Sequence, residues 1–143
     1  MTIEAILNRK GAKVATIKGE ATMSEAARIL AEANIGALVV SPDGSTVQGI
    51  LSERDIVKSL GQSGVSILEE PVSKHMTANV VTCQKSDRAV SIMGRMTQRR
   101  IRHLPVVDDG AMIGIVSIGD IVKTRIDELQ GEAEAMRDML HTY

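Results

Sequence analysis

The sequence predicts an α/β (α+β) fold in which two copies of a β-α-β-β-α repeat pack with pseudo-twofold symmetry, flanked by a helical segment at each end. Three observations predict it. The chain repeats itself internally, each copy alternates strand-like and helix-like patterns in the same order, and 143 residues suffice for two small packed units. Because neither unit could cover both faces of its sheet alone, we expect the two copies to pack against each other.

The internal repeat consists of three pairs of matching blocks, in the same order in both copies. One pair runs from Gly49 to Lys58 and from Gly114 to Lys123, and its blocks are identical at seven of ten positions. Agreement of this kind in three successive blocks is not expected by chance. The paired blocks are 14–17 with 80–83, 35–40 with 101–106, and 49–58 with 114–123.

Each copy predicts the same series of elements: a short β-rich run, an amphipathic helix, an apolar strand, a turn, a second strand and a closing helix. In the first copy, Thr22 and Glu25 have the spacing of a capping box at the start of the amphipathic helix. Strands are expected at 14–17, 35–40 and 47–51 and at 80–83, 101–107 and 112–116, with closing helices at 53–60 and from 118 onward.

These elements divide the chain into five segments. Two repeats are joined by a linker and flanked by an N-terminal helical segment and a C-terminal helical extension. The expected boundaries are 1–12, 13–60, 61–75, 76–127 and 128–143.

The C-terminal helix carries an apolar stripe with the spacing of a coiled-coil heptad. The stripe has two interpretations, packing against its own domain or contact with a second copy in a homodimer. Its members are Val122, Ile126, Leu129, Ala133, Met136 and Leu140.

Composition limits the classes of partner. The formal net charge is −1, so no overall field attracts nucleic acid or acidic membranes, and single-strand binders need aromatic residues, which make up 1% of this chain. No apolar run is long enough to span a membrane, and the N-terminus lacks the pattern of a signal peptide. The single cysteine, Cys83, favours a reducing compartment. We therefore expect a cytoplasmic protein with no nucleic-acid partner and no membrane.

The sequence offers no pattern of a catalytic site. His75, His103 and His141 lack metal-ligand spacing, and Cys83 lies in an apolar strand. There is no glycine-rich P-loop and no spaced nucleophile and base. We expect no enzyme activity, no metal and no catalytic cofactor.

Each copy has a serine followed three residues later by an aspartate at a predicted helix start: Ser52 with Asp55, and Ser117 with Asp120. The pair can cap the helix, because the serine accepts from the third backbone N–H and the aspartate returns a bond. The pair can also bind a nucleotide, because a helix start attracts phosphate and a carboxylate accepts ribose hydroxyls. The glycine three residues before each serine would let a ligand approach the backbone. The two roles are compatible.

These motifs, with the strand at 101–108, resemble the signature of the CBS domain family, Gly-apolar-x-Ser/Thr-x-x-Asp-apolar after such a strand. The run 71–77 resembles the usual start of a second CBS domain, and the resemblance covers about residues 10 to 127. The chain is similar to stand-alone bacterial proteins that contain a CBS pair and little else. The resemblance implies a Bateman module that binds AMP, ADP, ATP, NAD(H) or S-adenosylmethionine in two clefts between the repeats.

In such proteins the signature aspartate holds the ribose, the serine lies near ribose and phosphate, and the backbone of the first strand contacts adenine. The resemblance implies the same roles for the matching positions here. One cleft would combine Ser52 and Asp55 with Val81 and Thr82, and the other would combine Ser117 and Asp120 with Ala15 and Thr16.

We expect positively charged side chains in each cleft where the phosphate of a ligand would lie. Arg54 is well placed for a phosphate beside Asp55, whereas its counterpart Gly119 is not, so the clefts are expected to be unequal. Arg102 and His103 open a strand that should border the clefts, and as charged donors they would bind phosphate strongly. The nucleotide-binding residues expected from the resemblance are Ala15, Thr16, Gly36, Ala37, Ser52, Arg54, Asp55, Val81, Thr82, Arg102, His103, Pro105, Ser117, Gly119 and Asp120.

Two functions stay open from the sequence. The first is a regulatory module that senses an adenine nucleotide, forms a homodimer and acts on a protein effector. The alternative is a structural or protein-interaction CBS module with no physiological ligand. The intact serine and aspartate in both copies favour the first.

Overall fold

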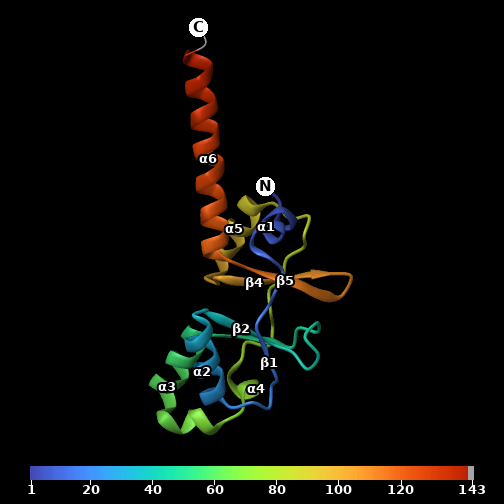
Figure 1. Cartoon of the computed structure of the whole chain (residues 1–143). Helices are drawn as coiled ribbons and strands as arrows, with labels where there is room; N and C mark the ends of the chain where they lie inside the picture. Colours follow the sequence, from blue (N-terminus) through green and yellow to red (C-terminus); the bar gives the residue numbers. More distant parts are fainter. Residues whose placement is uncertain (142–143) are drawn as a thin grey trace.

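The computed structural model describes residues 1–141 and contains two similar units whose sheets lie next to each other, with helices on the outer sides (Figure 1). The final residues of the expected C-terminal extension, 142–143, lie outside the described residues. The β-α-β-β-α order is confirmed in the first unit, and the second unit follows it except that the strand expected at 80–83 is reduced to a single bridge at Cys83. Among residues 1–141, no helix has both the length and the apolar composition of a membrane span.

The first unit is built on a three-stranded sheet in the order β1-β2-β3. Strand β1 runs parallel to β2, and β2 runs antiparallel to β3. Its core is aliphatic and is centred on Met23, Leu38 and Leu51. The elements are β1 (Thr16–Ile17), α2 (Met23–Ala33), β2 (Ala37–Val40), β3 (Gly49–Ser52) and α3 (Glu53–Ser63), followed by the 3₁₀ helix η1 (Val65–Glu69) and α4 (Val72–His75).

The second unit repeats this plan with a longer hairpin. Its first strand is reduced to a parallel bridge between Cys83 and Val106, in which the Cys83 N–H donates to the Pro105 carbonyl at 3.0 Å. Asn34 and Arg100 end the first helix of each unit, α2 and α5, in the left-handed conformation, with φ of 54° and 55°. The matching helix ends reflect the pseudo-twofold relation. The elements are α5 (Ala89–Arg99), β4 (His103–Asp108), β5 (Ala111–Ser117) and α6 (Ile118–His141).

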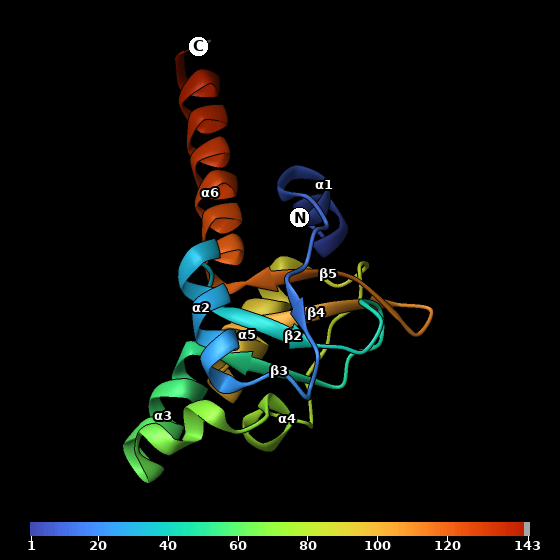
Figure 2. The same cartoon turned by 60° about the horizontal axis from the view of Figure 1, so that its bottom comes forward.

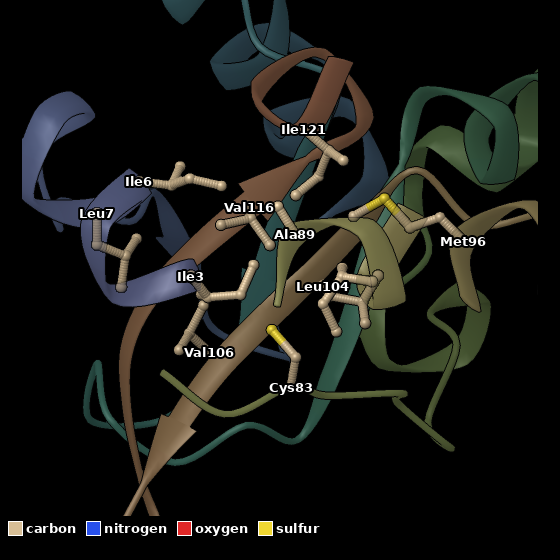
Figure 3. Close-up of a cluster of buried hydrophobic side chains, with 11 residues drawn as sticks. Ile3, Ile6, Leu7, Cys83, Ala89, Met96, Leu104, Val106, Val116 and Ile121 are labelled. Atoms are coloured by element: carbon tan, nitrogen blue, oxygen red, sulfur yellow. The ribbon is translucent and has the colours of Figure 1, made fainter. Parts of the chain in front are cut away.

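The helix that precedes each repeat packs on the other repeat. Helix α1 (Ile3–Lys10) comes before the first repeat, yet its Ile3, Ile6 and Leu7 side chains are buried in the core of the second unit (Figure 3). Helix α4 comes before the second repeat, and Val72 is buried in the core of the first unit. Figure 2 shows the chain passing from α1 through β1 into the other unit. This crossing covers a sheet face in each unit and ties the units together.

Gly49 and Gly114, the glycines three residues before the two serines, make room for these leading segments. A β-carbon at position 114 would lie 2.7 Å from Leu7 Cδ2, and one at position 49 would overlap the Met76 sulfur and lie 3.0 Å from the Thr77 carbonyl oxygen. The close approach that these glycines allow is therefore made by protein side chains, and the expectation that a ligand makes it is wrong.

Helix α6 extends well beyond the second unit (Figure 1). Only Ile121 and Thr124 of this helix are buried. Ile126 and Leu129 are each 49% exposed, and Leu140 is 73% exposed. The apolar stripe therefore does not pack against its own domain over most of its length.

We expect Gly49→Ala and Gly114→Ala each to lower the free energy of unfolding by about 1–3 kcal/mol, because the added methyl group overpacks the contact with the leading segment. Urea unfolding followed by circular dichroism measures this. The matched control is Gly94→Ala in the middle of α5, where a β-carbon meets nothing within 4 Å. That change should stabilise the helix by up to about 1 kcal/mol. Equal effects at all three positions would contradict the packing argument.

Candidate functional site

Both Ser-x-x-Asp motifs form helix caps. The Ser52 hydroxyl accepts from the Asp55 N–H at 3.3 Å, and Asp55 Oδ2 accepts from the Ser52 N–H at 2.9 Å. In the second copy the corresponding distances are 3.1 and 2.9 Å for Ser117 and Asp120. The capping role is therefore confirmed. All of these carboxylate bonds use Oδ2, so capping does not occupy both oxygens of either aspartate.

A cleft of about 540 Å³ lies between the two repeats on the side of Ser117. This volume falls within the usual range for small-molecule sites. The cleft brings together five of the residues expected from the sequence and adds two lysines from the end of α1 and the segment after it. Its lining includes Ala15, Gly36, Ala37, His103 and Ser117, together with Lys10, Lys13, Val14, Asn34, Ile35 and Ile115.

Lys10 holds the carboxylate of Asp120. The Lys10 ammonium donates to Asp120 Oδ2 at 2.6 Å and to the Ile115 carbonyl at 3.0 Å. Burial by itself would raise the pKa of Asp120, but hydrogen bonds from Lys10 and the Ser117 N–H outweigh it, and the pKa lies below its usual 3.8. Asp120 is therefore ionised at neutral pH. Sequence reasoning missed Lys10, because it is 110 positions away from its partner.

Lys10 also separates Asp120 from the larger cleft. The lining of the 540 Å³ cleft includes Lys10 and Ser117, whereas Asp120 lines a smaller cleft of about 240 Å³ between α1 and α6. Lys10 lines both clefts. The aspartate expected to hold a ribose is thus covered by a lysine on the side that faces the larger cleft.

His103 lies at the boundary of the two repeats. A β-carbon at Gly36 would lie 3.1 Å from His103 Cε1, so the lack of a side chain at this glycine leaves room for the imidazole ring. Burial, followed by the nearby Lys10 ammonium, lowers the pKa of His103 below 6.5, and the Asp120 and Glu53 carboxylates offset this only in part. The imidazole is therefore mostly neutral at pH 7, and the positive charge of this cleft comes from its lysines.

The surroundings of Asp55 differ from those of Asp120. No ion pair of Asp55 is found among residues 1–141. Helix α4 (Val72–His75) is shorter than α1, so it ends before a position equivalent to Lys10. On this side a cleft of about 330 Å³ brings together Arg54, Arg100 and Arg102 around an apolar floor that includes Met96 and Ile118. Two of the expected phosphate-binding residues, Arg54 from the first repeat and Arg102 from the second, therefore line the same cleft.

The other expected residues lie apart from these two clefts. Thr82 lines a separate cleft near the β4–β5 hairpin, and its carbonyl accepts from the Arg95 guanidinium at 3.1 Å. Thr16 lies in β1, Pro105 is buried in β4, and Val81 packs against the second core. A β-carbon at Gly119 would meet only the Ser117 hydroxyl within 4 Å, at 3.6 Å.

Three residues that sequence reasoning did not connect form a chain of hydrogen bonds. Glu70 Oε2 lies 2.7 Å from His75 Nε2, and His75 Nδ1 lies 3.0 Å from the Ser59 hydroxyl. The residue types are those of a hydrolase triad, but Ser59 lies inside α3, where neighbouring N–H groups are bound within the helix and cannot form an oxyanion hole. The arrangement ties α4 to α3. The clustering was missed because the three residues come from separate elements.

The family model of the CBS domain matches residues 3–62 and 72–127. A CBS-domain protein of Agrobacterium tumefaciens is 42% identical, and the likeness covers 87% of this chain and 99% of that chain with a TM-score of 0.85. The CBS domain-containing protein YhcV of Bacillus subtilis is 30% identical over 132 residues, 90% of each chain.

Two further relatives are informative, one for the ligands bound to it and one for its greater length. The CBS domain pair of protein MJ0100 was solved in complex with 5′-methylthioadenosine and S-adenosylmethionine; it is 27% identical, with 90% of this chain and 98% of that chain covered and a TM-score of 0.78. The match spans 58% of a mitochondrial CBS domain protein of Arabidopsis thaliana. Because the family model matches twice, over most of the sequence, and the fold is shared with solved CBS pairs, the chain belongs to the CBS domain family and contains two CBS repeats.

Proposed function

We propose that the chain is a regulatory module that binds an adenosine-containing nucleotide, such as AMP, ADP, ATP or NAD(H), between its two repeats. The observation that carries this proposal is the 540 Å³ cleft, which is lined by both repeats and adjoins the Ser117 and Asp120 cap. The relative MJ0100, whose CBS pair was solved with two adenosine compounds, supports the same class of ligand.

The lining of the cleft suits an adenosine. Val14, Ala15 and Ile35 offer aliphatic surface to a purine, in a chain with no Trp or Phe to stack on it. Asp120 would accept the ribose hydroxyls, while Lys13 and His103, which line the cleft, would donate to phosphate oxygens. Arg54 and Arg102 would serve phosphate in the second cleft.

Regulation follows from the position of the cleft between the repeats. A ligand in this cleft would contact both β2, at Ala37, and β4, at His103. It would stabilise the arrangement of repeats that fits it best, and it can shift an equilibrium only by its difference in affinity for the two arrangements. The alternative, a structural module with empty clefts, is favoured by the capping bonds, which account for both Ser-x-x-Asp motifs without a ligand. No catalytic step is part of the proposal.

Asp120→Asn and Asp55→Asn test the ligand role. Asparagine keeps the size of the cap but removes the charged acceptor for ribose, so we expect at least about 10-fold weaker binding of AMP at the altered cleft. Isothermal titration with AMP, ATP, NADH and S-adenosylmethionine measures this, and urea unfolding reports on folding. Asp108→Asn, which removes an exposed carboxylate paired with Lys85, is the control. A folded wild-type protein that binds none of the four compounds would favour the structural module.

We further propose that the partner of the exposed stripe on α6 is a second copy of this chain, in parallel orientation. With Ile126, Ala133 and Leu140 at positions a and Val122, Leu129 and Met136 at d, Glu132 falls at g and Arg137 at the following e. In a parallel pair these two residues attract across the interface. In an antiparallel pair, Lys123 and Arg137 at e would face each other and repel. Gly131 falls at the outer position f, away from the contact.

We expect Leu129→Glu to convert this dimer to a monomer, because a carboxylate at a central d position would be buried without a partner. Sedimentation velocity measures the mass. Val57→Glu is the matched control, since Val57 is 69% exposed on α3, away from the stripe. Arg137→Glu should weaken the dimer, and adding Glu132→Arg should restore it. A monomeric wild type, or a dimer unaffected by Leu129→Glu, would overturn the proposal.

A further inference from the structure

The ion pair between Lys10 and Asp120 is a feature of one repeat only. In the other repeat Met76 takes the place of Leu7, since it packs on Gly49 as Leu7 packs on Gly114. The shorter helix α4 (Val72–His75) ends without a counterpart of Lys10. Helix α1 is anchored by buried Ile3, Ile6 and Leu7, so its last residue, Lys10, is delivered to the edge of the 540 Å³ cleft. Among the differences between the two clefts is therefore a cation placed directly on one aspartate.

A ligand that uses Asp120 must compete with this cation. The Lys10 and Asp120 side chains are 32% and 22% exposed, so each would lose much of its compensation if the pair were broken without a replacement. Short charge-assisted bonds to Asp120 Oδ2 and the Ile115 carbonyl hold the ammonium in place. An uncharged nucleoside that took the carboxylate would leave Lys10 without a counter-ion.

We propose that the Asp120 cleft selects phosphorylated adenosine ligands, and that Lys10 is the residue that determines this selectivity. The inference rests on the proposed function. In the empty cleft Lys10 neutralises Asp120. When a nucleotide binds, its ribose hydroxyls take the carboxylate and Lys10 turns to the phosphate, which replaces the lost counter-ion. Adenosine and 5′-methylthioadenosine carry no such anion.

Charge on the rest of the cleft favours the same class of ligand. Lys13 lies on the lining with Lys10, so two ammonium groups face this cleft. Asp120 and Glu53 are the carboxylates that act on His103 in this region. The sulfonium of S-adenosylmethionine would add a positive charge beside two lysines, whereas a phosphate dianion would be attracted by both. AMP, ADP and ATP therefore fit this cleft better than a sulfonium ligand.

Lys10→Met tests the inference, because methionine has a similar length to lysine but carries no charge. Titration calorimetry with adenosine, AMP and ATP is carried out on the full chain, with urea unfolding to show that the variant folds. We expect the wild type to prefer AMP over adenosine by at least about 10-fold. In Lys10→Met this preference should fall by about 10-fold, with tighter binding of adenosine and weaker binding of AMP.

The control is Lys18→Met, which removes one positive charge from an exposed residue outside the cleft lining and should leave the preference unchanged. A Lys10→Met variant with the wild-type preference for AMP would overturn the inference while leaving the proposed function intact. Stronger wild-type binding of S-adenosylmethionine than of AMP would do the same. A wild type that binds none of the compounds would overturn both.

Discussion

The packing of each leading helix on the opposite repeat is the constraint on which the rest of this structure depends. A sheet of two or three short strands cannot bury both faces by itself. Here α1 fills one side of the second unit through Ile3, Ile6 and Leu7, and α4 fills the corresponding side of the first unit through Val72. Because each helix is covalently joined to a strand of the other unit, neither unit can move far without disturbing both cores.

The same crossing builds the site. It brings Lys10 and Lys13, which lead into the first repeat, to the Ser117 and Asp120 cap of the second. The cleft is thus formed by residues from both ends of the chain. Helix α1 is also joined to α6, because Arg9 pairs with Asp127 at 3.1 Å and the N-terminal ammonium pairs with Glu128 at 2.8 Å. A ligand that moved Lys10 would act on the helix next to the exposed stripe of α6, which gives the cleft a physical connection to a surface for a partner.

Pseudo-symmetry sets the plan of the two clefts, and single residues make them different. Both repeats keep the serine and aspartate cap and both end a helix in the left-handed conformation, at Asn34 and Arg100. These features follow from backbone geometry and are common to both copies. Lys10, which the longer helix α1 places beside Asp120, has no counterpart in α4 and adds a positive charge to one cleft only. Divergence at such positions lets one architecture hold two sites of unlike chemistry.

The sequence by itself determined the repeat, the order of elements and the two caps. Each of these depends on residues close together in the chain, such as Ser52 with Asp55 or the alternation of apolar residues in a strand. The helix starts confirm this, since Thr22, Ser52 and Ser117 all accept from a backbone N–H three residues on. Local patterns of this kind carry their own hydrogen-bond geometry and need no knowledge of the rest of the chain.

Only the tertiary structure decided which sheet each leading helix covers, that Lys10 binds Asp120, and that Ser59, Glu70 and His75 lie together. The apolar pattern of α1 predicts a buried face but not the partner that buries it, because either sheet presents an aliphatic surface of the same kind. The exposure of the α6 stripe was undetermined for the same reason. Hydrophobic burial is non-directional, so the partner of an apolar face is chosen by chain connectivity and by the fit of the whole molecule, such as Leu7 over Gly114.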